Sequence, residues 1–421
     1  MTDAFTYQGG SLHADAVDLA TLSAEIGTPF YCYSASAFRD SLGELQQAFN
    51  GIDPLIAYAM KANSNQAILT LLGKLGAGAD VVSLGELERA IAAGIAPEKI
   101  VFSGVGKSKA EMRRGLELGI HCFNVESEPE LERLNLIAGE MGQIAPVSVR
   151  INPNVDAKTH AKISTGKSEN KFGIPYERAE TVYAEIAAAK NLRAVGVDMH
   201  IGSQITDLEP FDNAFALLAE LVTRLKAAGH PIAHVDIGGG LGIVYEPLAH
   251  KPDIAAYAAL VVKHIAPLGC RLVLEPGRWI AGNAGVLVTR VEYVKTGAER
   301  HFVIVDAAMN DLIRPTLYEA WHDIAPVTEP QPDSETMTAD IVGAICETGD
   351  YLAQNRVLPK VVEGDLLAVK SAGAYGAVMA GTYNTRPLIA EVLVDGDRHH
   401  LIRPRQTLAD LIGQDDVPGW L

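Results

Sequence analysis

The chain has 421 residues, of which 48% are hydrophobic and 21% charged, a composition typical of a globular protein with more than one domain. Its formal net charge of −17 argues against nucleic acid as a partner, and it has no apolar stretch of the ~20 residues that a bilayer span needs. The N-terminus resembles no signal peptide, and the four cysteines form no CxxC pair. We therefore expect a cytoplasmic protein with reduced thiols and no membrane partner.

Residues 1–30 contain no β-α unit and are expected to join a later β domain. From about residue 55 to 275, short apolar runs alternate with amphipathic helical segments. The runs are rich in Val, Ile and Leu, as are parallel strands buried on both faces. The eight expected strands are Leu55–Met60, Ala79–Ser83, Ile100–Gly104, His121–Val125, Val147–Ile151, Val195–Ile201, His234–Ile237 and Arg271–Leu274.

Eight β-α units favour an α/β fold with a closed (β/α)8 TIM-like barrel, which we place at residues 31–280. A doubly wound nucleotide-binding fold would need a GxGxxG motif after its first strand, and none follows Leu55–Met60. The pattern changes after residue 285, where segments alternate in polarity or are β-branched, so residues 281–421 are expected to form a C-terminal β domain. Its expected strands are Gly285–Thr296, Phe302–Asp306, Ala339–Ile345, Leu366–Lys370 and Glu391–Val394.

Chemistry in such barrels lies at the C-terminal ends of the strands. Lys61 follows the first strand, and desolvation there would favour the neutral amine that forms an imine with a carbonyl. Gly238-Gly239-Gly240 follows the seventh strand and would let backbone N–H groups approach a phosphate. Glu275 follows the eighth, where a carboxylate could keep a pyridine ring protonated. Other candidates at strand ends are Asp80, His200, Ser203, Pro276, Gly277 and Arg278.

Each of these residues, taken alone, also has a structural interpretation, such as a strand-end lysine, a plain glycine turn or a core histidine. Their combination is more specific. Four runs resemble those of the fold-type III pyridoxal-phosphate decarboxylases, and the resemblance extends from about residue 28 to 390. The runs are Tyr58-Ala59-Met60-Lys61-Ala62-Asn63, His200-Ile201-Gly202-Ser203-Gln204, Gly238-Gly239-Gly240-Leu241-Gly242 and Glu275-Pro276-Gly277-Arg278.

This resemblance implies an alanine racemase-like barrel with a β domain, a pyridoxal 5'-phosphate cofactor, and a head-to-tail homodimer with shared active sites. It implies Lys61 as the Schiff-base lysine, His200 stacking on the cofactor ring and Glu275 at the pyridine nitrogen. Ser203, Gly239 and Gly240 would then bind the phosphate. An alanine-racemase-like enzyme would have arginine in place of Glu275, and a regulatory homologue would be expected to lack Lys61 or Cys346.

Two motifs of the β domain extend the resemblance. Cys346-Glu347-Thr348-Gly349-Asp350 is similar to the motif whose cysteine protonates the carbanion left by CO2, and Tyr375 matches a tyrosine that reaches phosphate and substrate. A buried small residue and a strand-end aromatic are the structural alternatives.

The candidate substrate site contains two arginines and a glutamate. Ornithine and arginine decarboxylases typically place Asp after the cysteine, where this chain has Glu347. Arg278 and Arg314 add guanidinium groups suited to a carboxylate. Arg278, Arg314, Tyr318, Glu347 and Tyr375 match the positions that hold meso-2,6-diaminopimelate in diaminopimelate decarboxylases.

The segment His160–Gly166, with Lys171-Phe172-Gly173, also resembles the active-site loop of diaminopimelate decarboxylases. The resemblance therefore implies an amino-acid substrate, meso-diaminopimelate, and release of L-lysine and CO2 in the last step of lysine biosynthesis. A decarboxylase of carboxynorspermidine, ornithine or arginine is the alternative.

Overall fold

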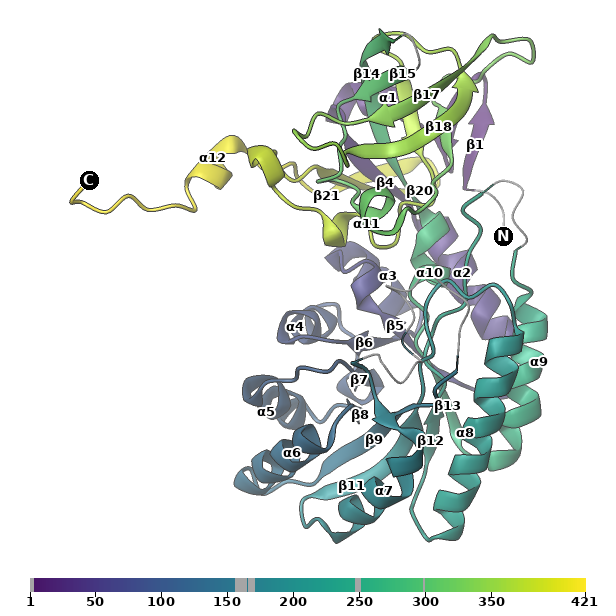
Figure 1. The fold of residues 1–421 in the computed structure, drawn as a ribbon, viewed down its shortest axis with the longest axis vertical. Coiled ribbons are helices and arrows are strands. Elements are labelled where there is room, and N and C mark those ends of the chain that lie inside the picture. The colour runs from purple at the N-terminus through teal and green to yellow at the C-terminus, as the bar shows by residue number, and fades with distance from the viewer. Residues whose placement is uncertain (1–3, 156–164, 166–170, 247–250, 298–299) are drawn as a thin grey trace. The chain divides into compact units, whose positions relative to one another are not determined.

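The computed structural model describes residues 4–155, 165, 171–246, 251–297 and 300–421 (Figure 1). The described chain divides into two compact units. One unit holds the described residues of Met1–Asp40, Val244–Ala249 and Ala281–Leu421, and the other holds those of Ser41–Ile243 and His250–Ile280. The first is built mainly from β-sheet and the second is a barrel of parallel strands surrounded by helices.

The barrel unit confirms the predicted (β/α)8 fold. Its strands, in order around the barrel, are β5 (Leu55–Ala59), β6 (Gly78–Val81), β7 (Ile100–Phe102), β8 (Cys122–Val125), β9 (Ala145–Asn152), β11 (Leu192–Asp198), β12 (His234–Asp236) and β13 (Arg271–Leu274). All these pairings are parallel, and β13 pairs with β5, which closes the sheet. A two-residue strand, β10 (Ile174–Pro175), pairs with the end of β9. Every residue of β5 is buried, as its continuous apolar sequence requires.

Helices connect the barrel strands, and α4 and α6 begin within three residues of the preceding strand, whereas α7, α8 and α9 follow longer loops. Serine N-caps start three of them: Ser83 before α4, Ser108 before α5 and Ser127 before α6, each accepting a hydrogen bond from a backbone N–H. Because the barrel strands are parallel, their C-terminal ends and the residues that follow them lie at one end of the barrel. The helices are α2 (Ala35–Ala48), α3 (Gln66–Lys74), α4 (Leu84–Ala92), α5 (Lys109–Leu118), α6 (Glu128–Glu140), α7 (Ala179–Ala188), α8 (Glu209–Ala227), α9 (Ile254–His264) and α10 (Arg278–Ala281).

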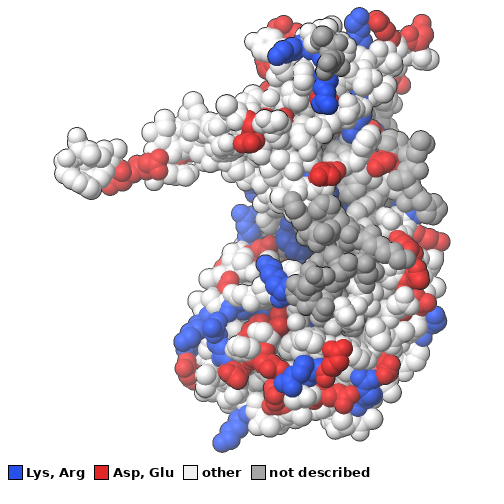
Figure 2. All heavy atoms as spheres, viewed as in Figure 1, with Lys and Arg blue, Asp and Glu red and all other residues white. Residues whose placement is uncertain are grey.

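The outer faces of the barrel helices carry charges of both signs. Figure 2 shows acidic and basic side chains interspersed over this part of the drawn face. Ion pairs link neighbouring helices, for example Arg113 of α5 with Glu140 of α6, and Arg114 of α5 with Glu88 of α4. Such exposed pairs contribute at most about 1 kcal/mol each, so packing of the apolar helix faces dominates the stability.

The β unit is organised around β14 (Gly285–Thr296), which pairs with three other strands. Its large sheet has the order β18 (Tyr351–Pro359), β17 (Thr336–Val342), β15 (His301–Val305), β14, β4 (Phe30–Ser34), β20 (Ala390–Asp395) and β21 (Arg398–Arg403). Beside it, β19 (Leu366–Val369) joins β14 to β16 (Ile324–Pro326). The remaining elements are β1 (Phe5–Gln8), β2 (Ser11–Ala14), β3 (Val17–Asp18), α1 (Leu19–Ile26), α11 (Arg314–Tyr318) and α12 (Leu408–Ile412).

Apolar side chains from both ends of the chain form the core of this unit. Phe5, Leu19, Phe30, Val286 and Val392 belong to one buried cluster. The β domain predicted from the alternating sequence pattern is therefore present. None of the helices within the described ranges is long and apolar enough to span a bilayer.

Candidate active site

Lys61 lies immediately beyond β5. The strand ends at Ala59, one residue before its expected end at Met60. Lys61 belongs to the 3₁₀ turn Met60–Ala62 that follows the strand. Its Nζ donates a hydrogen bond to Asp80 Oδ2 at 3.1 Å. The Asp80 side chain is fully buried, whereas that of Lys61 is 40% exposed. The desolvation expected from the sequence is therefore partial, and the amine has an ionic partner while it stays accessible.

Three carboxylates cluster at the ends of neighbouring strands. Oxygens of Asp198 (end of β11), Asp236 (end of β12) and Glu275 (after β13) lie within 4.8 Å of one another, and all three residues are buried. Glu275 Oε1 accepts hydrogen bonds from Ser103 Oγ at 3.2 Å and Asn124 Nδ2 at 3.3 Å. Burial, followed by the charge of Asp236, raises the pKa of Glu275 well above its ordinary value. Burial also raises the pKa of Asp236 to about 6.

The carboxylate cluster and the neighbouring Asp80 contain more hydrogen-bond acceptors than the surrounding donors can satisfy. Oδ1 of Asp80, Oδ1 of Asp198 and Oδ2 of Asp236 are buried without a hydrogen-bond partner among the described residues. Buried carboxylates that repel one another and lack donors favour either shared protons or a bound cation. The site therefore has the electrostatic character of a receptor for a positively charged ring.

The glycine run that follows β12 packs its backbone against the residues that follow the neighbouring strands β11 and β13. Gly239 N–H donates to His200 Nδ1 at 3.1 Å. A Cβ on Gly239 would lie 2.2 Å from the carbonyl oxygen of Glu275, and a Cβ on Gly240 would lie 2.4 Å from that of Gly202. Gly240 also has a φ of +97°, in the left-handed region. No side chain fits at either position, so the turn packs backbone against backbone.

His200 is a neutral imidazole in this setting. Burial lowers its pKa well below the ordinary value, and the cations of Arg150 and Lys61 act in the same direction. Because Nδ1 accepts a hydrogen bond from Gly239, the ring proton is on Nε2. A neutral ring can pack against a flat aromatic group without adding a charge.

The turn after β13 packs on the turn that holds Lys61. Pro276 C=O accepts a hydrogen bond from Ala59 N–H at 3.1 Å, and a Cβ on Gly277 would lie 3.2 Å from Ala59 Cβ. Arg278 Nη2 donates to Ser203 Oγ at 3.2 Å. Residues at the ends of six strands, β5, β6, β7, β11, β12 and β13, are thus brought together in one unit.

These residues fit pyridoxal phosphate. Lys61 offers an amine for the aldehyde, the Ser203 hydroxyl beside the glycine turn offers a donor for the phosphate, and Glu275 offers a carboxylate for a protonated ring nitrogen. The fit rests on the buried carboxylate oxygens that have no hydrogen-bond donor, because a cationic ring would compensate their charge.

In the β unit, Arg314 is held by two rings. Its Nη1 donates to His322 Nε2 at 2.7 Å, and its guanidinium lies 4.6 Å from the centre of the Tyr245 ring. His322 Nδ1–H donates in turn to the Lys370 carbonyl at 2.8 Å, which fixes the histidine tautomer. Arg314 is 5% exposed, so its side chain has a defined orientation. Tyr318 ends the same short helix and is partly buried.

The loop between β17 and β18 carries Cys346 and Glu347, and both are exposed. Cys346 N–H donates to Asn384 Oδ1 at 2.9 Å, and Glu347 Oε2 accepts from the Tyr383 hydroxyl at 3.3 Å. Asp350 accepts from the backbone N–H of Ile345 at 2.7 Å and so closes the loop. The thiol is therefore presented on a loop with a fixed backbone.

The predicted residues fall into two groups. Those of the barrel unit surround Lys61, and those of the β unit are Arg314, Tyr318, Cys346, Glu347 and Tyr375. Tyr375 is partly buried and has a φ of +57°. Of the predicted loop His160–Gly166, only Thr165 lies within the described residues, and its hydroxyl donates to the His200 carbonyl at 3.0 Å.

Several supporting residues were not predicted. They are Ser103, Asn124, Asp198, Asp236, Tyr245 and His322. Four of them lie in or beside barrel strands that are otherwise apolar, as Asn124 does in Cys-Phe-Asn-Val. A polar residue inside a buried strand was the available signal, because such a group needs a partner.

Comparison with known proteins agrees with the cofactor that this geometry fits. Residues 36–282 match the family model of the pyridoxal-dependent decarboxylases, pyridoxal binding domain. The chain is 52% identical to the diaminopimelate decarboxylase of Vibrio cholerae, over 99% of both chains. A crystal structure of diaminopimelate decarboxylase from Helicobacter pylori, complexed with L-lysine, has 42% identity and a TM-score of 0.91, covering 94% of this chain and 99% of that one.

A diaminopimelate decarboxylase structure from M. jannaschii, also with L-lysine, has 39% identity and a TM-score of 0.94 and covers 100% of this chain and 99% of that one. These likenesses extend over both the barrel and the β unit. The chain belongs to the diaminopimelate decarboxylase family of pyridoxal-dependent enzymes.

Proposed function

We propose that this chain uses pyridoxal phosphate to decarboxylate meso-2,6-diaminopimelate, giving L-lysine and CO2. The observation that carries the proposal is the Lys61–Asp80 pair, with 3.1 Å between its charged atoms, at the barrel end that also holds Glu275 and the glycine turn. The named relatives support the choice of substrate. An assay of CO2 release from meso-diaminopimelate, with and without added cofactor, tests it.

Bound pyridoxal phosphate supplies an electron sink for the electron pair that remains when CO2 departs. Lys61 would hold the cofactor through its amine, and Asp80, whose Oδ2 lies 3.1 Å from Nζ, would orient that amine. A protonated ring nitrogen held at Glu275 would favour the ionised carboxylate, because a cation lowers the pKa that burial and the neighbouring carboxylates raise. Cys346 then transfers its thiol proton to Cα of the substrate.

The proposal includes a homodimer in which Cys346 of one subunit serves the barrel of its partner. The family resemblance supports this arrangement, and the exposed position of Cys346 leaves it available to a second chain. The same proposal places the enzyme in the cytoplasm, where its free cysteines stay reduced.

Glu275→Gln is expected to lower kcat without emptying the cofactor site. The amide cannot stabilise a ring cation by charge, and each lost unit of ring-nitrogen pKa corresponds to about 1.4 kcal/mol, or about tenfold in rate if fully felt. The amide also relieves repulsion from Asp198 and Asp236, so the melting temperature should not fall. If the kcat of Glu275→Gln is unchanged at saturating cofactor, Glu275 has only a structural role.

The proposed substrate has a distal ammonium and a distal carboxylate. Arg278 and Arg314 provide guanidinium groups for the carboxylate, and Glu347 provides a carboxylate for the ammonium. Removing the distal carboxylate, as in L-lysine, leaves a guanidinium without its ligand. Sites built to bind a polar group reject analogues that lack it by about 10⁴-fold or more.

We expect Arg314→Ala to raise KM for meso-diaminopimelate by at least about tenfold, while the visible absorbance of the bound cofactor is unchanged. Arg398→Ala, which removes an arginine with a side chain 79% exposed, is the matched control and should leave KM unchanged. A fall in kcat with constant KM would contradict a substrate-binding role for Arg314.

Substrate choice is tested by CO2 release from meso-diaminopimelate, L-lysine, L-ornithine, L-arginine and carboxynorspermidine. We expect kcat/KM to be highest for meso-diaminopimelate by several orders of magnitude. A comparable value for any of the other four would overturn the substrate and leave the cofactor and fold intact.

A further inference from the structure

A cluster of two histidines and a cysteine lies at the opposite end of the barrel strands from Lys61. His121 immediately precedes β8, Cys122 is the first residue of β8, and His234 is the first residue of β12. Strand β8 pairs with β7 and β9, while β12 pairs with β11 and β13, so the two strands are not neighbours in the sheet. The cluster therefore bridges two separated strands at the N-terminal end of the barrel.

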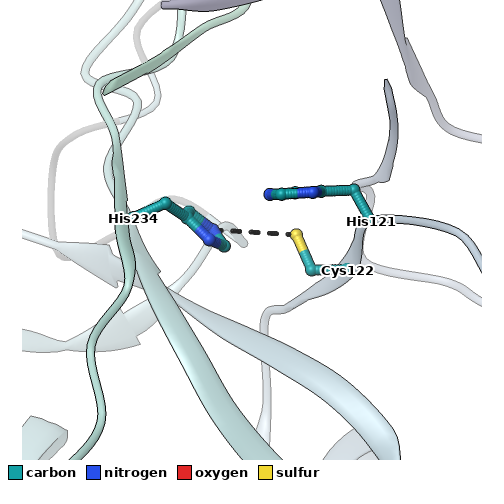
Figure 3. Close-up of side chains that lie close together, drawn as sticks. All are labelled: His121, Cys122 and His234. Atoms are coloured by element: carbon teal, nitrogen blue, oxygen red, sulfur yellow. Dashed lines mark hydrogen bonds between the residues drawn. The ribbon is translucent and has the colours of Figure 1, made fainter. Parts of the chain in front are cut away.

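The three side chains converge on one another. One potential ligand atom from each lies within 4.8 Å of those from the other two. Cys122 Sγ is 3.8 Å from His234 Nε2, and the two imidazole centres are 4.8 Å apart. Figure 3 shows the sulfur pointing at the His234 ring and the His121 ring directed into the same space.

We propose that His121, Cys122 and His234 form a binding site for a thiophilic divalent transition-metal ion of the zinc class. Tetrahedral zinc bound at 2.3 Å by sulfur and about 2.0 Å by nitrogen sets the sulfur–nitrogen separation at about 3.6 Å. The separation of 3.8 Å between Cys122 Sγ and His234 Nε2 is close to that value. His121 needs only a small ring movement to complete a three-residue set with one open position.

His121 provides the independent observation that points to a ligand. Its Nε2 is buried without a hydrogen-bond partner among the described residues. The ring is hydrogen-bonded to the backbone of Glu98. A hydrogen bond from one ring nitrogen to the backbone usually orients a metal-binding histidine and leaves the other nitrogen as the ligand. A metal ion would satisfy that nitrogen.

The protonation states suit the metal. Burial lowers the pKa of His121 and lowers that of His234 to about 3, so both rings are neutral and have a free lone pair. Burial raises the pKa of Cys122 well above its ordinary value, so the residue is a thiol before binding. Coordination replaces its proton, and each bound ion should release one proton.

The surrounding charges come from several elements. Arg271 faces both histidines, and Lys107 acts on Cys122; both cations oppose a bound metal. The carboxylates of Asp236, Asp198 and Glu275 also act on Cys122 and favour a cation there.

The consequence would be a cross-link between β8 and β12. A ligand that binds only the folded state raises the melting temperature, by a few degrees for a chain of this size at a concentration of about a hundred times Kd. His121 is partly buried, whereas Cys122 and His234 are buried, so the cluster meets the solvent at His121.

The test uses the cofactor-loaded enzyme and Co²⁺ as a spectroscopic probe. We expect tetrahedral d–d bands at longer wavelengths than the absorbance of the cofactor, saturation at one ion per chain, and release of one proton per ion. Zn²⁺ should displace Co²⁺, remain at one ion per chain after dialysis, and raise the melting temperature.

Cys122→Ser keeps the size of the side chain and should abolish the bands and the zinc-dependent stabilisation. His121→Gln, at the partly exposed edge of the cluster, should weaken binding at least tenfold and serves as the second variant if Cys122→Ser does not fold. Cys270→Ser and His400→Ala are controls that should bind like the parent chain, since neither residue belongs to the cluster. Failure of the folded parent chain to bind, or unchanged binding by folded Cys122→Ser or His121→Gln, would overturn the proposal.

Discussion

Lys61→Ala is expected to lower the rate of decarboxylation by at least about 10³-fold and to remove the visible absorbance of lysine-bound cofactor. Lys61 is the amine at the barrel end that holds the carboxylate cluster and the glycine turn, and its Nζ is held 3.1 Å from Asp80. In the proposed mechanism, covalent attachment of the cofactor and proton transfer both depend on this amine, so the two losses in rate multiply. Steady-state kinetics with meso-diaminopimelate and an absorption spectrum measure them.

A control separates the role of Lys61 from a general loss of charge. Lys263→Ala removes a lysine with a side chain 58% exposed, paired with Asp212 on the outer surface of the barrel unit, and should leave both readouts unchanged. Borohydride reduction followed by peptide mapping identifies the modified lysine in the parent enzyme. Recovery of the reduced adduct on another residue at normal yield would contradict the assignment.

The barrel could be predicted because the residues of each strand are enough to identify it as a buried strand. A strand buried on both faces must be apolar throughout, as in Leu-Ile-Ala-Tyr-Ala of β5. Strands β4, β16, β18 and β21 of the β unit were not predicted from the sequence. Strand β4, Phe-Tyr-Cys-Tyr-Ser, is short and pairs with β14 and β20, both distant in sequence. In β18 the central Gln-Asn-Arg breaks the apolar pattern beside a bulge in its pairing with β17.

The candidate site residues at the strand ends could be predicted from the sequence. The residues that orient them could not. Lys61, Glu275 and the glycine turn occupy positions where barrels carry chemistry, and their motifs are distinctive. The partners that orient Arg314 could not be inferred, because Tyr245 lies among the barrel residues in sequence but belongs to the β unit in space. Such a pairing depends on tertiary structure alone.

Cys346→Ala is expected to lower kcat by about 10²- to 10³-fold while cofactor absorbance stays unchanged. The thiol is exposed on a loop with a fixed backbone, and Ala keeps the backbone donor that bonds Asn384. Removing the thiol therefore removes a proton donor without disturbing the loop. Cys270→Ala is the matched control and should retain full kcat.

Mixing the two inactive variants tests whether the site is shared between subunits. If Cys346 serves the partner's barrel, a dimer of one Lys61→Ala and one Cys346→Ala subunit contains one complete site and one that lacks both residues. Random exchange of equal amounts makes about half of the dimers mixed, and each has half of the normal sites. We therefore expect recovery of about a quarter of the parent activity, by this binomial count for a symmetric dimer. No recovery, after exchange is verified by mass spectrometry of tagged subunits, would place Lys61 and Cys346 in the site of one and the same chain.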